Sequence, residues 1–110
     1  MSTPSTASQE ILDELVRRIV EAVHPHRIVL FGSAARGQMG PHSDLDVLVV
    51  MPDGVHRRQT ARHLYRTLHD FDMSKDLVVV TESDVRDYAD EPSLVICPAL
   101  EEGKELYRAT

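Results

Sequence analysis

Three acidic residues at the starts of two apolar runs are the side chains best suited to chemistry. Asp44 and Asp46 open the run 44–50, and Asp76 lies near the start of the run 75–81. Side chains along a β-strand alternate between two faces, so Asp44 and Asp46 are expected to point the same way. Two carboxylates this close favour a cation, and Mg²⁺ commonly binds one or two carboxylates together with substrate phosphates.

Asp76 joins the same acidic cluster if the two apolar runs form neighbouring strands. There are simpler alternatives for both groups. Asp44 and Asp46 can be exposed acids beside a loop, and Asp76 can be a strand-end acid paired with Lys75 or an arginine.

Gly32 and Ser33 add a possible phosphate cradle. They follow the apolar run 27–31 and precede an expected helical turn at 33–37. Glycine lets the backbone approach a ligand closely, and amides at a helix start favour an anion such as phosphate. Taken alone, this junction can equally be an ordinary tight turn.

Phosphate cradle and carboxylates together predict metal-assisted phosphoryl or nucleotidyl transfer. One metal ion would hold a triphosphate and neutralise the leaving pyrophosphate. A second would lower the pKa of an attacking hydroxyl, whose proton a third carboxylate could accept.

The elements that must position these residues follow from hydrophobic periodicity and turn signals. An amphipathic helix over 8–24 begins at a capping box formed by Thr6 and Gln9 and ends before Pro25. The helix 56–71 places Ala61, Leu64, Tyr65, Leu68 and Phe71 on one apolar face. The other expected elements are strands at 27–31, 44–50, 75–81 and 105–107, a loop at 38–43, and helices near 83–89 and 92–102.

The chain is expected to form one α+β domain with a mixed sheet. Its 110 residues allow one compact domain, residues 8–110, after a flexible tail at 1–7. A hydrophobic content of 42% is in the ordinary globular range. The sequence has no apolar run near membrane-span length, no secretory signal and a single cysteine, Cys97, which together predict a cytoplasmic protein.

Charge is distributed unevenly along the chain. The net charge of −6 argues against sequence-independent binding of nucleic acid, which needs a basic field. The segment 82–105 carries eight acidic and two basic residues, which is the whole net charge. It can be a solvated face of two surface helices or a docking surface for a basic partner.

Arg58, Arg62 and Arg66 lie four residues apart, with Asp70 next. They form either a solvated face with helical ion pairs or a contact with triphosphate or a partner.

The chemical residues also resemble a known signature. Gly32-Ser33, ten further residues and then Asp44-x-Asp46 are similar to the GS-x10-D-x-D signature of the DNA polymerase beta-type nucleotidyltransferase superfamily. The fuller runs 32–37 and 43–49 resemble those of the minimal nucleotidyltransferases. The resemblance implies a polymerase beta-like nucleotidyltransferase fold, a mixed β-sheet flanked by helices.

The resemblance also implies roles for the site residues. Asp44 and Asp46 would bind metal, and a later strand would supply a third acid, a position that fits Asp76 as metal ligand and base. Gly32 and Ser33 would hold the nucleotide phosphates. Two further nucleotide contacts within the matching runs are Arg36 and Ser43.

Bacterial proteins of this size in that family are typically antitoxins of HEPN–nucleotidyltransferase toxin–antitoxin pairs. The resemblance therefore implies transfer of AMP from ATP, with Mg²⁺ at a two-metal site, to a tyrosine of a HEPN-domain RNase toxin. A chain of this length has no room for an acceptor domain. The acceptor pocket is then expected from a partner in a hetero-oligomer or from a homodimer, without direct nucleic-acid or membrane binding.

Two other functions stay open at this point. The chain can be an antitoxin that neutralises its partner by occlusion, using the acidic segment 82–105. It can also be an enzyme that modifies another acceptor, such as tRNA or a small molecule. Replacing Asp44 and Asp46 together by asparagine abolishes neutralisation if catalysis is responsible and preserves it if binding is.

Overall fold

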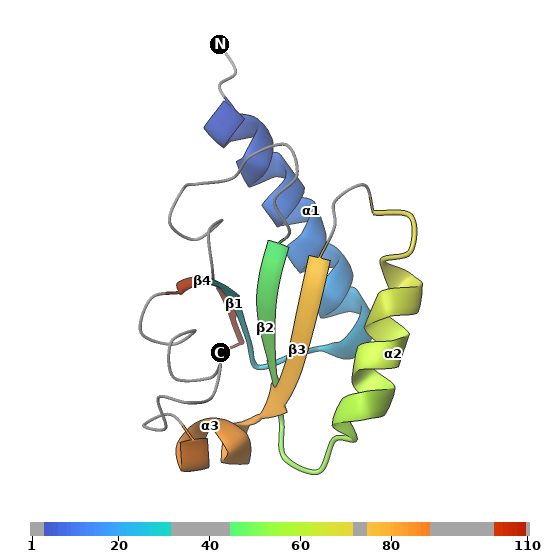
Figure 1. The fold of residues 1–110 in the computed structure, drawn as a ribbon, viewed down its shortest axis with the longest axis vertical. Helices are drawn as coiled ribbons and strands as arrows, with labels where there is room; N and C mark the ends of the chain where they lie inside the picture. Colours follow the sequence, from blue (N-terminus) through green and yellow to red (C-terminus); the bar gives the residue numbers. More distant parts are fainter. Residues whose placement is uncertain (1–3, 32–44, 72–74, 89–102, 110) are drawn as a thin grey trace.

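The computed structural model describes residues 4–31, 45–71, 75–88 and 103–109, which form a four-stranded sheet with three helices (Figure 1). The expected helical turn at 33–37, the loop at 38–43 and the helix near 92–102 lie outside these residues. The elements in chain order are α1 (Pro4–Val23), β1 (Arg27–Phe31), β2 (Leu45–Met51), α2 (Arg57–Thr67), β3 (Lys75–Thr81), α3 (Glu82–Tyr88) and β4 (Lys104–Arg108).

The sheet is mixed, as the sequence predicts. Its strand order is β3-β2-β1-β4, with β1 antiparallel to both β2 and β4 and with β2 parallel to β3. A parallel pair needs a crossover connection. Here α2 supplies that connection and packs beside β3 (Figure 1). The short strand predicted at 105–107 is confirmed within β4.

Helix α1 begins earlier than the sequence analysis predicts. It starts at Pro4, inside the predicted tail and four residues before Ser8, so a start at the Thr6–Gln9 capping box is wrong. Proline is well suited to the first helical turn, where its missing N–H costs nothing and its fixed φ is already helical. The C-terminal end is as expected, because His24 adopts a left-handed φ of 51° and donates its N–H to the Val20 carbonyl at 3.0 Å.

Helix α2 is shorter than the predicted 56–71. The side chain of His56 caps its start by accepting the Gln59 N–H at 3.2 Å. Beyond Thr67 the chain continues in tighter turns, in which Phe71 N–H donates to the Leu68 carbonyl at 3.0 Å. Three-residue bonds of this kind commonly satisfy the last carbonyls of a helix.

The two faces of the sheet bury side chains to different extents. The helix-covered face packs against α1 and α2, which lie behind the sheet and at its β3 side in Figure 1. The opposite face, called the open face below, carries a smaller cluster completed by Val85 of α3. Alternation along β2 sends Val47 to the first face and Leu48 to the second, although both are fully buried. The helix-covered core includes Leu12, Leu15, Ile19, Ile28, Leu30, Leu45, Val49, Met51, Leu64, Leu68 and Leu77.

Helix α3 starts at Glu82, one residue before its predicted start, and is held by a reciprocal cap. Asp84 N–H donates to the Thr81 hydroxyl at 3.2 Å, and Thr81 N–H donates to the Asp84 carboxylate at 3.0 Å. This Thr-x-x-Asp pair is a capping box. Arg57 also bonds the Asp84 carboxylate at 3.0 Å, which ties the start of α2 to the start of α3. Among the described residues, no helix is long and apolar enough to cross a membrane.

Candidate active site

Asp46 of β2 and Asp76 of β3 are direct partners across the parallel strand pair. Adjacent strands lie about 4.8 Å apart, so paired residues project side by side from one face. That face is the open one, because Leu48 and Val50, which follow Asp46 at two-residue steps, belong to its cluster. Asp46 is half-buried and Asp76 is exposed. From the sequence alone, it is conditional whether the run 75–81 neighbours the run 44–50, and the pairing of β2 with β3 meets that condition for Asp46 and Asp76.

The strand geometry does not direct Lys75 toward Asp76. Consecutive strand residues point to opposite faces, so Lys75 projects on the helix-covered side. There its ammonium lies 5.7 Å from the centroid of the Phe71 ring. The alternative in which Asp76 is a structural acid paired with Lys75 is therefore not favoured.

A cation–aromatic cluster anchors the end of β3 that carries Asp76. The Arg18 guanidinium lies 5.8 Å from the Phe71 centroid, while Lys75 lies over the same ring. Arg18 also bonds the Asp70 carboxylate at 2.8 Å, and that bond is the main cause lowering the pKa of Asp70. Helix α1, the turn after α2 and the start of β3 are thus tied together behind the acidic pair.

Five predicted site residues lie outside the described part of the chain. They belong to the connection between β1 and β2, whose flanking strand residues are described. β1 ends at Phe31, which is the register partner of Asp46, and β2 begins at Leu45. Both ends of this connection are therefore fixed beside Asp46. The five residues are Gly32, Ser33, Arg36, Ser43 and Asp44.

The described residues provide two oxygen-donor side chains for a cation, Asp46 and Asp76. No group of three or more potential metal-ligating side chains occurs within the described ranges. Two adjacent carboxylates on one face have the donor chemistry that Mg²⁺ prefers, and substrate phosphates normally complete such a site. The donor set therefore fits a magnesium-dependent reaction, with Asp44 as the expected additional ligand.

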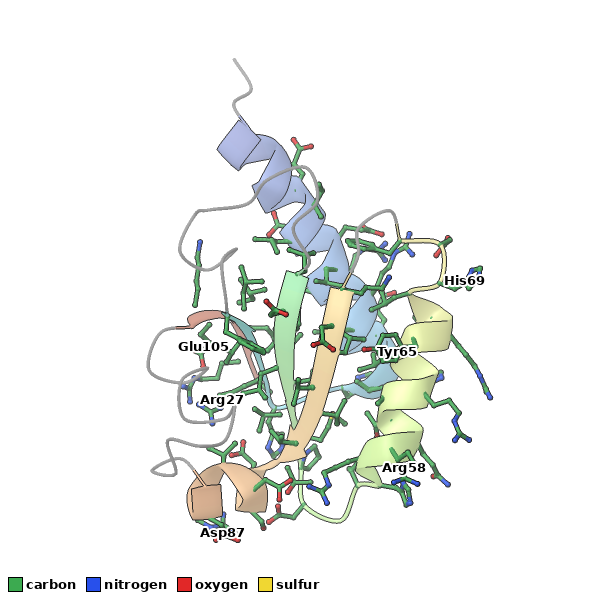
Figure 2. The ribbon with its side chains drawn as sticks, viewed as in Figure 1. Arg27, Arg58, Tyr65, His69, Asp87 and Glu105 are labelled. Carbon is green, nitrogen blue, oxygen red and sulfur yellow. The ribbon has the colours of Figure 1, made fainter. Side chains whose placement is uncertain are left out.

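Arg27 is an open-face residue that the sequence analysis did not consider. It lies two strand positions before Val29, a member of the open-face cluster, and its side chain is only 18% exposed. Figure 2 shows it on the same sheet, and its guanidinium lies 4.0 Å from the Glu82 carboxylate. His26 contacts the other oxygen of Glu82 at 3.1 Å. Side chains alternate along a strand, so Arg27, Val29 and Phe31 share one face. This alternation is the sequence signal that places Arg27 on the open face.

Comparison with known proteins agrees with this geometry. The family model of the nucleotidyltransferase domain matches residues 10–106. A solved structure of a candidate nucleotidyltransferase from Sulfolobus solfataricus has a TM-score of 0.63 at 17% identity, over 98% of this chain and 90% of its own. No curated protein sequence matches the chain.

Two further solved structures belong to toxin–antitoxin pairs. A toxin–antitoxin with AMP-PNP has a TM-score of 0.61 and 25% identity, over 90% of this chain and 74% of its own. A tri-AMPylated Shewanella oneidensis HEPN toxin in complex with its MNT antitoxin has a TM-score of 0.54 and 22% identity, over 92% and 72%. At 22% identity the second likeness concerns the fold alone.

The mixed sheet with an acidic pair on its open face is thus a nucleotidyltransferase fold. The chain belongs to the nucleotidyltransferase domain family. The predicted polymerase beta-like fold and the prediction that the chain is a transferase are confirmed.

Proposed function

We propose that this protein is an antitoxin that transfers AMP from ATP to a tyrosine hydroxyl of a cognate HEPN-domain RNase toxin. The observation that carries the proposal is the register pairing of Asp46 with Asp76 on the open face of a nucleotidyltransferase domain. The likeness to a toxin–antitoxin structure with AMP-PNP supports the nucleotide and the kind of partner.

The reaction places each described acid in a defined role. The tyrosine oxygen attacks the α-phosphorus of ATP, and a new P–O bond forms as the bond to the β-phosphate oxygen breaks. Pyrophosphate leaves with the electron pair of that bond, and the tyrosine proton passes to a base. Asp76 is the proposed base, because it is the exposed member of the pair and can reach an acceptor that approaches from solvent.

Asp46 is the proposed anchor for the metal-bound triphosphate. It is half-buried, and the other face of its strand lies in the helix-covered core, so its backbone is rigidly held. Asp44 is proposed as a second metal ligand, because the sequence predicts a strand that starts at residue 44 and alternate residues of a strand share a face. When bound, Mg²⁺ would neutralise charge on the triphosphate and lower the pKa of the attacking hydroxyl.

The proposed roles for the connection 32–44 rest on its fixed ends. Phe31 pairs with Asp46, so the residues that follow it along the chain start beside the acidic pair. Gly32 and Ser33 are proposed to hold the nucleotide phosphates with their backbone amides, and Arg36 and Ser43 to add contacts. No part of this proposal requires a basic surface for nucleic acid.

The decisive experiment is an intact-mass measurement on a HEPN-domain protein encoded beside this gene. The protein is purified after expression alone, with the wild-type chain, and with the Asp44→Asn/Asp46→Asn variant. Added mass equal to one or more AMP units is expected only with the wild-type chain. Peptide mapping should then place the addition on a tyrosine.

Two outcomes would contradict the proposal in different ways. Neutralisation of the toxin without added mass means that the chain acts by occlusion. Radiolabel transferred from α-³²P-ATP to tRNA or to a small molecule means that the chain is a transferase but that its acceptor is not the toxin.

A further inference from the structure

Helix α2 presents a basic stripe to solvent. Arg58, Arg62 and Arg66 are exposed and lie four residues apart, so each is about 6 Å further along the helix axis than the one before. The helix, Arg57–Thr67, contains no acidic residue. Figure 2 shows Arg58 on the first turn of α2.

These three guanidiniums have no carboxylate partner within the described residues. The sequence suggested an ion pair between Arg66 and Asp70, but Asp70 is bonded to Arg18 of α1. The fourth arginine of the helix, Arg57, is bonded to Asp84. The interpretation of this face as a row of helical ion pairs is therefore wrong for the described chain.

The stripe, which has no carboxylate partner in the part of the chain that the structure describes, costs the isolated protein some stability. Like charges four residues apart on a helix repel by about 0.2–0.5 kcal/mol per pair. Carboxylates from another molecule would remove this repulsion and form charge-assisted hydrogen bonds with the guanidiniums. The arrangement is therefore one that an acidic partner would stabilise.

Tyr65 lies beside the stripe and is held in place. It is 44% exposed, although helix periodicity predicts it on the apolar face of the helix. Its hydroxyl accepts the Leu77 N–H of β3 at 3.0 Å, which fixes the ring between α2 and the sheet edge (Figure 2). Tyrosine and arginine are enriched among residues that dominate protein–protein affinity, whereas lysine is depleted at interfaces. Helix α2 has no lysine.

We propose that the α2 face formed by Arg58, Arg62, Tyr65 and Arg66 docks an acidic surface of the protein that accepts AMP. This inference rests on the proposed function, which supplies a protein acceptor. Because α2 packs against β3, a partner bound there lies alongside the strand that carries Asp76.

The observations favour a protein over a nucleic acid. Single-stranded nucleic acids bind by stacking bases on aromatic rings along a basic groove. Tyr65 is the one Phe, Tyr or Trp residue of α2, so this helix has no row of rings on which successive bases could stack. Three guanidiniums would also displace few counterions in a chain whose net charge is −6.

The observations also favour a different protein over a second copy of this chain. Most described acidic side chains outside the candidate site are already engaged within the same molecule. Glu82 contacts Arg27 and His26, Asp84 bonds Arg57, and Glu105 bonds Arg108.

The test measures binding of the neighbouring HEPN-domain protein by isothermal titration calorimetry, without nucleotide. The Arg58→Glu/Arg62→Glu/Arg66→Glu variant should weaken binding about 100-fold, and Arg62→Glu alone about tenfold. Lys104→Glu is the matched control, because Lys104 is exposed on β4 and the change in charge equals that of Arg62→Glu. The control should bind like the wild type. Circular dichroism confirms that each variant is folded.

The outcomes separate this proposal from the proposed function. Unchanged binding by the triple variant, or no complex with the wild-type chain, overturns the docking surface. Weakened binding in a pair that shows no AMP transfer supports the surface and contradicts the enzymatic role. A single-stranded RNA that binds the wild type and not the triple variant, while toxin binding is unaffected, shows a nucleic-acid surface instead.

Discussion

The helix-covered face and the open face of the sheet are built from the same strands but differ in how much of each face is buried. On the first, α1 and α2 close over a large apolar core. On the second, a smaller cluster under α3 leaves Asp46 partly exposed and Asp76 exposed. The register of β2 and β3 determines both the apolar core and the position of the acidic pair, because successive side chains along a strand point to opposite faces. A well-packed face behind the acids lets the other face stay open without losing its geometry.

The largest expected effect is on activity and concerns the open face. Asp46→Asn and Asp76→Asn should each lower AMP transfer by about 100-fold or more, because each removes a charge from the reacting centre. For Asp76→Asn the free energy of unfolding, measured in urea, should not fall. Asp87→Asn on α3 is the control and should retain full transfer. Wild-type rates for Asp76→Asn would remove Asp76 from the mechanism.

The next effect is on stability and compares the two apolar clusters. Leu30 and Leu48 are equally buried but lie on opposite faces. Leu30→Ala should cost about 4 kcal/mol of unfolding free energy and Leu48→Ala about 2, because the smaller cluster can collapse more readily around a cavity. Equal losses in urea denaturation would mean that the open-face cluster is packed as tightly as the helix-covered core.

A smaller effect is expected at the start of α3. Asp84→Ala removes its half of the capping box and the bond to Arg57, so about 1–2 kcal/mol should be lost. Hydrogen exchange should speed up in α3 and at Thr81 while α1 stays protected. Equal acceleration in α1 would show that the cap supports the whole fold rather than one end of the open face.

The smallest effect is a pH dependence on the helix-covered side. Arg18 lowers the pKa of Asp70 in the folded protein. A lowered carboxyl pKa contributes stability that is present above the unfolded-state pKa and is lost as the pH falls through the folded-state pKa. Asp70→Asn should therefore flatten the fall in unfolding free energy below about pH 4. If the variant and the wild type lose unfolding free energy equally at low pH, the Arg18–Asp70 pair makes no measurable contribution to stability.

The acidic pair was predictable because two local patterns agree. Short apolar runs predict both strands, and each run carries an acid near its start, Asp46 in one and Asp76 in the other. That Asp46 and Asp76 become partners depends on β2 and β3 being neighbours. Which strands are neighbours depends on contacts between distant parts of the chain, so the sequence alone does not decide it. The sheet order shows that β2 and β3 are neighbours.

The sequence predictions differ from the structure at helix starts and at Tyr65, and each difference has a physical cause nearby. The pattern of Thr6 and Gln9 predicts a capping box, but the helix starts at Pro4. A related pattern, Thr81-x-x-Asp84, forms the cap of α3 with Asp in place of Glu or Gln. The exposure of Tyr65 could not be predicted from helix periodicity, because its hydroxyl partner, Leu77, lies on another element. The roles of Gly32, Ser33, Arg36, Ser43 and Asp44 stay predictions from their spacing.

The bond between Tyr65 and Leu77 also bears on self-assembly. β3 is an outer strand of the described sheet, and the free amides of such strands are templates on which another chain can polymerise. Tyr65 occupies the Leu77 amide, and Asp84 occupies the Thr81 amide further along the same strand. Side chains thus block hydrogen-bonding positions at both ends of this outer edge. The strand that carries Asp76 therefore has fewer free amides on which another chain could polymerise.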